Sequence, residues 1–163
     1  MSVNKAKPHV LVIPEDEADG DLANGFLREI EWGLQRQMQV LPEANGWLSV
    51  LDRFESDEVE GMVRFPNRFM VLLIDFDGEF KSRLPIAKAR IPEHLSERVF
   101  VIGARDEPED LKRVGLGTLE EIGYKLAKDC REDTYSTWGH DLLKHNESEL
   151  SRLHQHVRPI LFP

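Results

Sequence analysis

Carboxylates follow three short apolar segments of this 163-residue sequence, and they are the side chains best suited to do chemistry. The segment Phe69–Ile74 ends in Asp75 and Asp77, which lie two residues apart and would share one face of an extended chain. Gly78 comes directly after them and allows the backbone to turn away sharply. Because both carboxylates can approach the same point, they are the first candidates for holding a cation.

Two further acidic groups follow the other apolar segments. Glu15 follows His9–Ile13, and Glu109 follows Val99–Ile102. Neighbouring acids are alternatives for both places: Asp16 and Glu17 in the first group, and Asp106, Glu107 and Asp110 in the second. If the three segments are parallel strands, their carboxyl ends meet at one edge of a sheet, where α/β proteins bind ligands. Carboxylates gathered there repel one another, and a hard divalent cation offsets that repulsion. The sequence therefore predicts a Mg²⁺ or Mn²⁺ site that combines these two acids with the aspartate pair.

A divalent cation at this edge indicates chemistry on phosphate. Mg²⁺ prefers oxygen ligands, keeps several of its waters, polarises a phosphoryl oxygen and helps to generate hydroxide. Three basic residues close to the acids in sequence are candidates for binding the substrate phosphate, namely Arg83, Lys81 and Arg105.

The elements that must position these residues alternate between strand and helix. Four short apolar segments predict strands, at His9–Ile13, Met38–Leu41, Phe69–Ile74 and Val99–Ile102. Apolar residues three and four apart predict a helix of about four turns from near Asp21, capped by Asp19 or Asp21. Similar patterns and capping signals predict further helices over Trp47–Phe54, from near Pro108, from Thr118 to about Lys128, and from near Ser136 to Val157. We expect Ser56–Gly61 to be a solvated acidic segment and the stretch around Pro85 and Pro92 to be a polar loop.

This alternation predicts an α/β fold with a mostly parallel sheet of about four strands, helices on both faces, and further helices at the C-terminus. The length and the absence of a linker-like segment predict one domain over residues 1–163. The net charge of −9, from 30 acidic and 21 basic residues, argues against a free-standing reader of DNA sequence. Cys130 is the single cysteine, which excludes a scaffold held by internal disulfides. With no signal peptide or membrane span visible, we expect a cytoplasmic protein.

The acidic motifs, in this chain order, resemble those of the Toprim fold, the catalytic domain of topoisomerases, primases and overcoming-lysogenization-defect nucleases. The matching positions are Glu15 after the first strand, Asp75 and Asp77 in Leu-Ile-Asp-Phe-Asp-Gly, and Glu109 in Glu-Pro-Glu-Asp-Leu. The resemblance is to the nuclease branch and covers about residues 8–113, with residues 114–163 as a helical extension.

The resemblance to Toprim proteins implies roles for these residues. Asp75 and Asp77 would hold Mg²⁺, Glu109 would be a further ligand, and Glu15 would be a general acid/base or a ligand of a second metal ion. The implied reaction is hydrolysis or transfer of a phosphodiester on nucleic acid, within a larger nucleic-acid-processing or phage-defence complex.

Two alternatives stay open. Leu-Leu-Ile-Asp75-Phe-Asp77-Gly78 also resembles the first motif of haloacid-dehalogenase phosphatases, which would make Asp75 a nucleophile. In the other alternative, the protein is a non-catalytic interaction module whose acids are structural. An apolar C-terminal surface, formed by Trp138, the last helix and the tail of residues 160–163, would then dock a protein partner.

Overall fold

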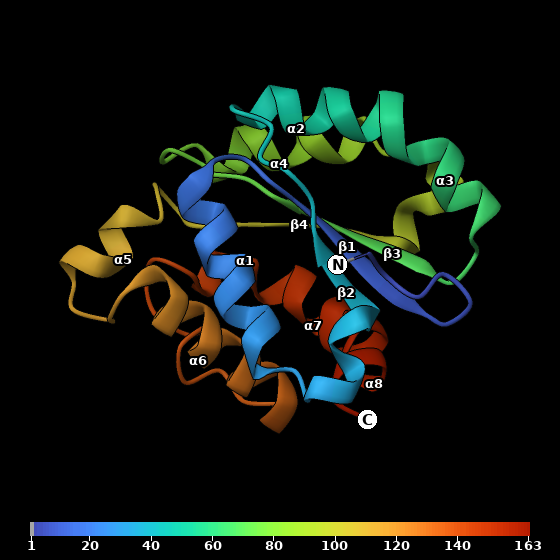
Figure 1. The fold of residues 1–163 in the computed structure, drawn as a ribbon. Coiled ribbons are helices and arrows are strands. Elements are labelled where there is room, and N and C mark those ends of the chain that lie inside the picture. The colour runs from blue at the N-terminus through green and yellow to red at the C-terminus, as the bar shows by residue number, and fades with distance from the viewer. Residues whose placement is uncertain (1) are drawn as a thin grey trace.

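Four parallel strands form the centre of the computed structural model, which describes residues 2–163 (Figure 1). The strands are β1 (His9–Pro14), β2 (Met38–Val40), β3 (Arg68–Leu73) and β4 (Val99–Ile102), in the spatial order β2-β1-β3-β4. All three neighbouring pairs are parallel, which confirms the predicted parallel sheet and the α/β class.

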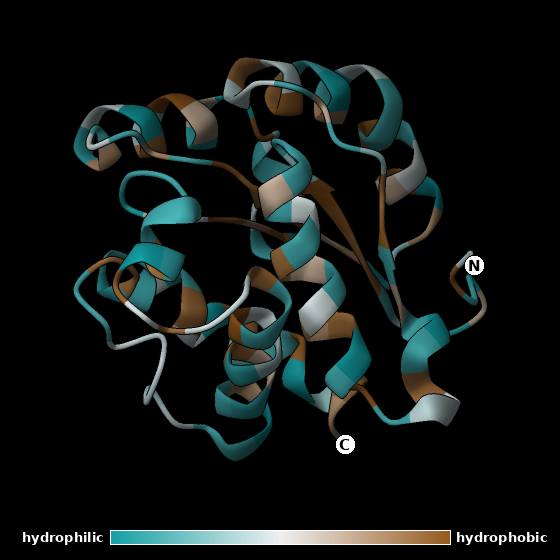
Figure 2. Ribbon diagram, turned by 60° about the vertical axis from the view of Figure 1, so that its left-hand side comes forward, coloured by the Kyte–Doolittle hydropathy of each residue, from teal (hydrophilic) through white to brown (hydrophobic). Residues whose placement is uncertain are grey.

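Both faces of the sheet are covered, because successive strand residues point into two different apolar clusters. In β3, for example, Val71 and Leu73 belong to one cluster, whereas Met70 and Leu72 belong to the other. This explains why the strands read as continuous rather than alternating apolar runs. Figure 2 shows the strands in the colour of hydrophobic residues between helices of mixed polarity.

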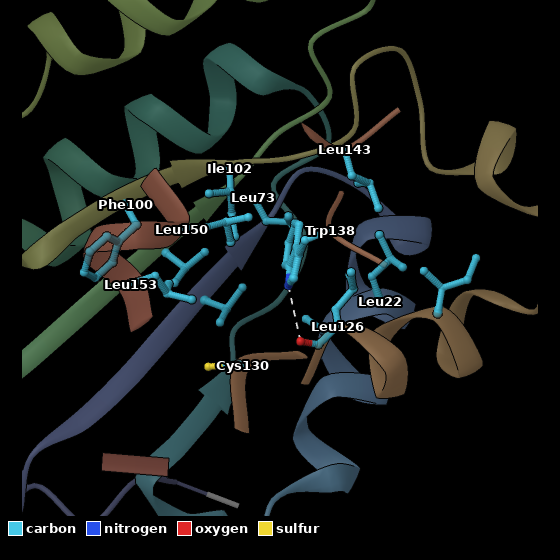
Figure 3. Close-up of a cluster of buried hydrophobic side chains, with 14 of the residues drawn as sticks. Leu22, Leu73, Phe100, Ile102, Leu126, Cys130, Trp138, Leu143, Leu150 and Leu153 are labelled. Carbon is cyan, nitrogen blue, oxygen red and sulfur yellow. Dashed lines mark hydrogen bonds between the residues drawn. The ribbon is translucent and has the colours of Figure 1, made fainter. Parts of the chain in front are cut away.

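Four helices cover one face: α1 (Glu17–Glu29), α6 (Leu119–Glu132), α7 (Glu147–His156) and α8 (Arg158–Leu161). Trp138, which precedes α7, lies in the middle of this layer and donates its indole N–H to the Leu126 carbonyl at 3.2 Å (Figure 3). Helices α1 and α6 pack closely, because a β-carbon at Gly123 would lie 2.0 Å from the Leu22 carbonyl oxygen.

Helices α2 (Trp47–Arg53), α3 (Val59–Arg64) and α4 (Phe80–Ala89) cover the other face (Figure 1). A π-helical turn over Phe54–Glu58 joins α2 to α3, so that the two form one bent helical segment. The short helix α5 (Glu109–Arg113) adds Leu111 to the first apolar cluster, and 3₁₀ turns lie at Trp32–Gln37, Glu93–Arg98 and Lys144–Asn146. No helix within residues 2–163 is both long and apolar enough to cross a membrane.

The structure corrects four of the predicted elements. Helix α1 begins at Glu17 rather than near Asp21, because the Asp16 side chain caps it by accepting from the Asp19 N–H at 3.0 Å. The predicted solvated segment Ser56–Gly61 is helical, and the predicted polar loop before β4 contains α4, with Pro85 inside it. The last predicted helix is divided, since residues 134–146 form turns and α7 begins only at Glu147.

Side chains and turns from the C-terminal region close the outer edge of β4. The Asn146 side chain accepts from the Gly103 N–H and donates to the Gly103 carbonyl, at 3.1 and 2.9 Å. Glu149 accepts from the Val101 N–H at 3.1 Å, and the Arg105 N–H donates to the Leu142 carbonyl at 2.9 Å. Three backbone groups that a fifth strand could use, the N–H of Val101 and the N–H and carbonyl of Gly103, are therefore already bonded.

Candidate metal centre

The predicted site lies where the chain leaves β1 and β3, the two central strands. After β1 the chain enters α1 on one face of the sheet, and after β3 it enters α4 on the opposite face. The strand order also diverges here, because β2 lies on one side of β1 and β3 lies on the other. In open parallel sheets, such a point forms the crevice in which ligands bind.

Three carboxylates meet at this point: Glu15, Asp19 and Asp75, which we call the acidic triad. Each contributes an oxygen that lies within 4.8 Å of the others. All three residues are buried, with 9%, 0% and 5% of their surface exposed, respectively. In residues 2–163 this is the one group of three metal-ligating side chains that the fold gathers.

Different elements position the three acids. Glu15 directly follows β1, and its Oε2 accepts from the Asp75 backbone N–H at 2.5 Å, which ties the end of β1 to the end of β3. Asp75 follows β3 by two residues. Asp19 lies in the first turn of α1, where the Asp16 cap fixes the helix start.

Several oxygens of the triad have no hydrogen-bond partner. Both carboxylate oxygens of Asp19 and the Oδ1 of Asp75 are buried and accept from no N–H or hydroxyl group, and the two carboxyl groups lie close enough to share a proton. Leaving one buried polar group unpaired costs about 1–3 kcal/mol, and more when the group is charged. The triad therefore requires protons or a cation to offset this cost.

The electrostatics of the triad favour protonation in the absence of a cation. Burial and the neighbouring carboxylates raise the pKa of Asp75 to about 8 and hold the pKa of Asp19 well above its ordinary value. The pKa of Glu15 is also raised by burial, although the hydrogen bond from the Asp75 N–H opposes the shift. At neutral pH the empty triad thus retains protons that a metal ion would displace.

Asp19 is the member of the triad that sequence reasoning missed. The sequence pattern predicts Asp19 only as a possible cap of the first helix, whereas the structure shows that Asp16 is the cap. A signal was available, because Asp19 is three and four residues before the buried Leu22 and Ala23 and therefore lies on the apolar face of α1. An acid on this buried face, two turns or less from the predicted ligand Glu15, could have been included among the candidate metal ligands.

Asp77 does not join the triad. Its backbone has φ of 48°, in the left-handed region, and 51% of its side chain is exposed. Its Oδ2 instead accepts from Arg83 Nη1 at 2.9 Å. The expectation that Asp75 and Asp77 share a face assumed an extended chain, and the turn at Asp77 removes that condition.

The predicted acids near β4 also lie outside the triad. Glu109 begins α5 and is half-buried, and Glu107 and Asp110 both pair with Arg113. Of the alternatives near β1, Asp16 is the helix cap and Glu17 is exposed.

Of the three predicted phosphate-binding residues, Arg83 is the one that contacts the site. Its Nη1 donates to the Asp75 carbonyl at 2.8 Å. Arg105 pairs with the adjacent Asp106 at 3.1 Å, and Lys81 is exposed in the first turn of α4.

A groove of about 470 Å³ lies between α1 and the end of β2, and no residue of the triad lines it. Three of its lining residues are acidic, namely Glu17, Asp21 and Glu43. The acidic lining makes this groove unfavourable for a phosphate, and Arg83 lies in α4, on the opposite face of the sheet.

Comparison with known protein families, with curated proteins and with solved structures finds no match to this chain. The site is accordingly interpreted from its own geometry: a buried Glu/Asp/Asp triad that could hold a metal ion, with one arginine beside it.

Proposed function

We propose that the acidic triad binds a divalent cation, Mg²⁺ or Mn²⁺, and that the protein uses it to hydrolyse or transfer a phosphodiester on nucleic acid. The observation that carries the proposal is the convergence of Glu15, Asp19 and Asp75 with buried, unpartnered oxygens. Acids placed only to cap helices would point to backbone N–H groups, as Asp16 does. The Asp19 carboxylate has no such partner.

The donor set fits a hard cation. All three side chains offer oxygen, which suits Mg²⁺ and Mn²⁺ better than the nitrogen and sulfur sets that zinc prefers. Asp19 and Asp75 would be the main ligands because their free oxygens are buried together. Glu15 has one oxygen held by the Asp75 N–H, which leaves its other oxygen to contact the metal or to exchange a proton with the substrate.

Phosphate chemistry follows from the same arrangement. A bound divalent cation supplies Lewis-acid activation of a phosphoryl oxygen and lowers the pKa of a bound water. Arg83 adds the positive charge that an oxyanion needs at the side of the triad. The choice of a phosphodiester, and of nucleic acid as its source, rests on the order of motifs that resembles Toprim nucleases.

The proposed setting includes a protein partner. With a net charge of −9 the chain offers little long-range attraction to nucleic acid, so a partner would deliver the substrate. The apolar C-terminal residues that suggested a docking surface pack within the chain, since Trp138 and Leu161 are 4% and 1% exposed. Phe162 lies against Phe26, with ring centroids 6.0 Å apart.

Calorimetric titration with Mg²⁺ and Mn²⁺ tests the metal site. We expect the wild-type protein to bind, and the double variant Asp19→Asn/Asp75→Asn to lose binding. Glu17→Gln is the matched control, because it removes an exposed charge from the same first turn of α1. Absence of binding in the wild-type protein would overturn the proposal and favour a non-catalytic interaction module.

Cleavage assays with single-stranded and duplex DNA and RNA then test the reaction. We expect activity that requires Mg²⁺ or Mn²⁺ and disappears in the double variant. Metal binding without cleavage of any of these substrates, but with release of phosphate from monoesters, would instead support the phosphatase alternative with Asp75 as the nucleophile.

A further inference from the structure

The contacts of Arg83 suggest what happens beside the triad when substrate arrives. The side chain is only 14% exposed, although it carries a permanent charge. Its guanidinium carbon lies 4.7 Å from the centre of the Trp47 ring, and its Nη1 is bonded to the Asp75 carbonyl. Stacking and hydrogen bonding together hold the guanidinium in one orientation at the edge of the site.

The hydrogen-bonding capacity of Arg83 is only partly used. Asp77 occupies Nη1, whereas Nε is buried and has no partner. The nearest acid to Nε is Glu79, whose Oε2 lies 3.7 Å away, beyond hydrogen-bonding distance. Arginine binds carboxylates and phosphates most strongly when two parallel N–H groups are engaged. The present contact with Asp77 is therefore weaker than the one that a phosphate could make.

The Asp77 side chain is easily displaced. Half of it is exposed, so that it can turn into water without leaving a buried charge behind. An ion pair in which one partner is half-exposed changes an equilibrium by up to about fivefold, which a bidentate contact to phosphate can exceed.

We propose that Arg83 is the phosphate-binding residue of this site and that Asp77 is its resting counter-ion, which a phosphoryl oxygen of the substrate displaces. The inference rests on the proposed function, because it places the phosphate beside the metal-binding triad. It assigns Asp77 a role different from the metal ligand that the Toprim resemblance implies. Asp77 then lowers affinity for anions instead of contributing to metal affinity.

Titration with inorganic phosphate at constant ionic strength tests the inference. The NMR signal of the Trp47 indole N–H monitors binding, because Arg83 stacks on the Trp47 ring. The titration is run once with EDTA and once with saturating Mg²⁺. We expect Asp77→Asn to bind phosphate about two- to fivefold more tightly than wild type, the range set by exposed ion pairs. Asparagine suits the left-handed backbone at this position, so the turn should persist.

Two further variants complete the test. Arg83→Gln should abolish saturable phosphate binding, whereas the matched control Arg90→Gln should bind as wild type does, because Arg90 follows the other end of α4 and pairs with Asp52 and Glu55. Equal phosphate affinity in wild type and Arg83→Gln would overturn the inference. A tenfold or greater loss of Mg²⁺ affinity in Asp77→Asn would also overturn it, by making Asp77 a metal ligand. If Mg²⁺ binding fails in every protein, the titration with EDTA still decides the role of Arg83.

Discussion

Replacing Asp75 with asparagine should change how the stability of the protein depends on pH. In the folded protein the pKa of Asp75 is about 8, against an ordinary value of 3.8. Between these values the folded state holds one proton more than the unfolded state. The free energy of unfolding therefore falls as pH rises through this range, because the unfolded chain ionises freely and the folded chain does not.

The magnitude follows from the shift. One proton of difference corresponds to about 1.4 kcal/mol per pH unit, or about 3 kcal/mol between pH 5 and pH 7. Asp19 contributes with the same sign, because burial and Asp75 also raise its pKa. Burial lowers the pKa values of the buried His9 and the half-buried His145, which act in the opposite direction. The contributions of the two histidines to the free energy of unfolding cancel when wild type and variant are compared at the same pH.

Urea denaturation at pH 5, 6, 7 and 8 in the presence of EDTA measures the effect. Asp75→Asn should gain stability relative to wild type as pH rises, by about 3 kcal/mol between pH 5 and pH 7. Asp77→Asn is the control and should follow the wild type, since its exposed side chain lies outside the triad. Mg²⁺ should stabilise the wild type at pH 7 and reduce the difference. A constant difference between wild type and Asp75→Asn at all four pH values would refute the reasoning.

Two other predictions concern the packing of α1 against α6 and the turn between α6 and α7. Gly123→Ala should destabilise the protein by more than about 2 kcal/mol, because the new β-carbon would overlap the Leu22 carbonyl between α1 and α6. Gly20→Ala should instead stabilise α1 by up to about 1 kcal/mol, because the space around Gly20 is open. Thermal melts of both variants check this pair, and equal melting temperatures would contradict it. Asp129→Ala should cost at least about 3 kcal/mol in urea denaturation, since the Asp129 carboxylate accepts from three backbone N–H groups and a hydroxyl in residues 134–138. A loss below about 1 kcal/mol would show that this turn is held mainly by the burial of Trp138.

The strands and two members of the triad could be predicted from local sequence. A continuous apolar run such as Phe69–Ile74 has few alternatives to a buried strand, and a parallel sheet brings the ends of its strands to one edge. Glu15 and Asp75 therefore meet as expected.

The remaining features depend on tertiary contacts that local patterns do not encode. The region around Pro85 looked like a loop because proline disfavours helix interiors, yet Ala87 on the same helix is fully buried and packing fixes α4. Asp77 leaves the extended conformation because the loop after β3 pairs with the loop after β4, where the Asp77 N–H donates to the Asp106 carbonyl at 3.0 Å. Asp19 lies in the site because α1 packs against the sheet on the side of its apolar residues.

The closure of the β4 edge makes the order of synthesis matter for this protein. All four strands have been translated by Ile102, but the groups that seal the outer edge come from residues 142–149. Asn146 lies 43 positions after its partner Gly103, and Glu149 lies 48 positions after its partner Val101. A nascent chain that has folded its sheet must wait for that segment with an open strand at its side. During this interval the open strand can pair with other nascent copies, and residues 142–149 form the seal that ends it.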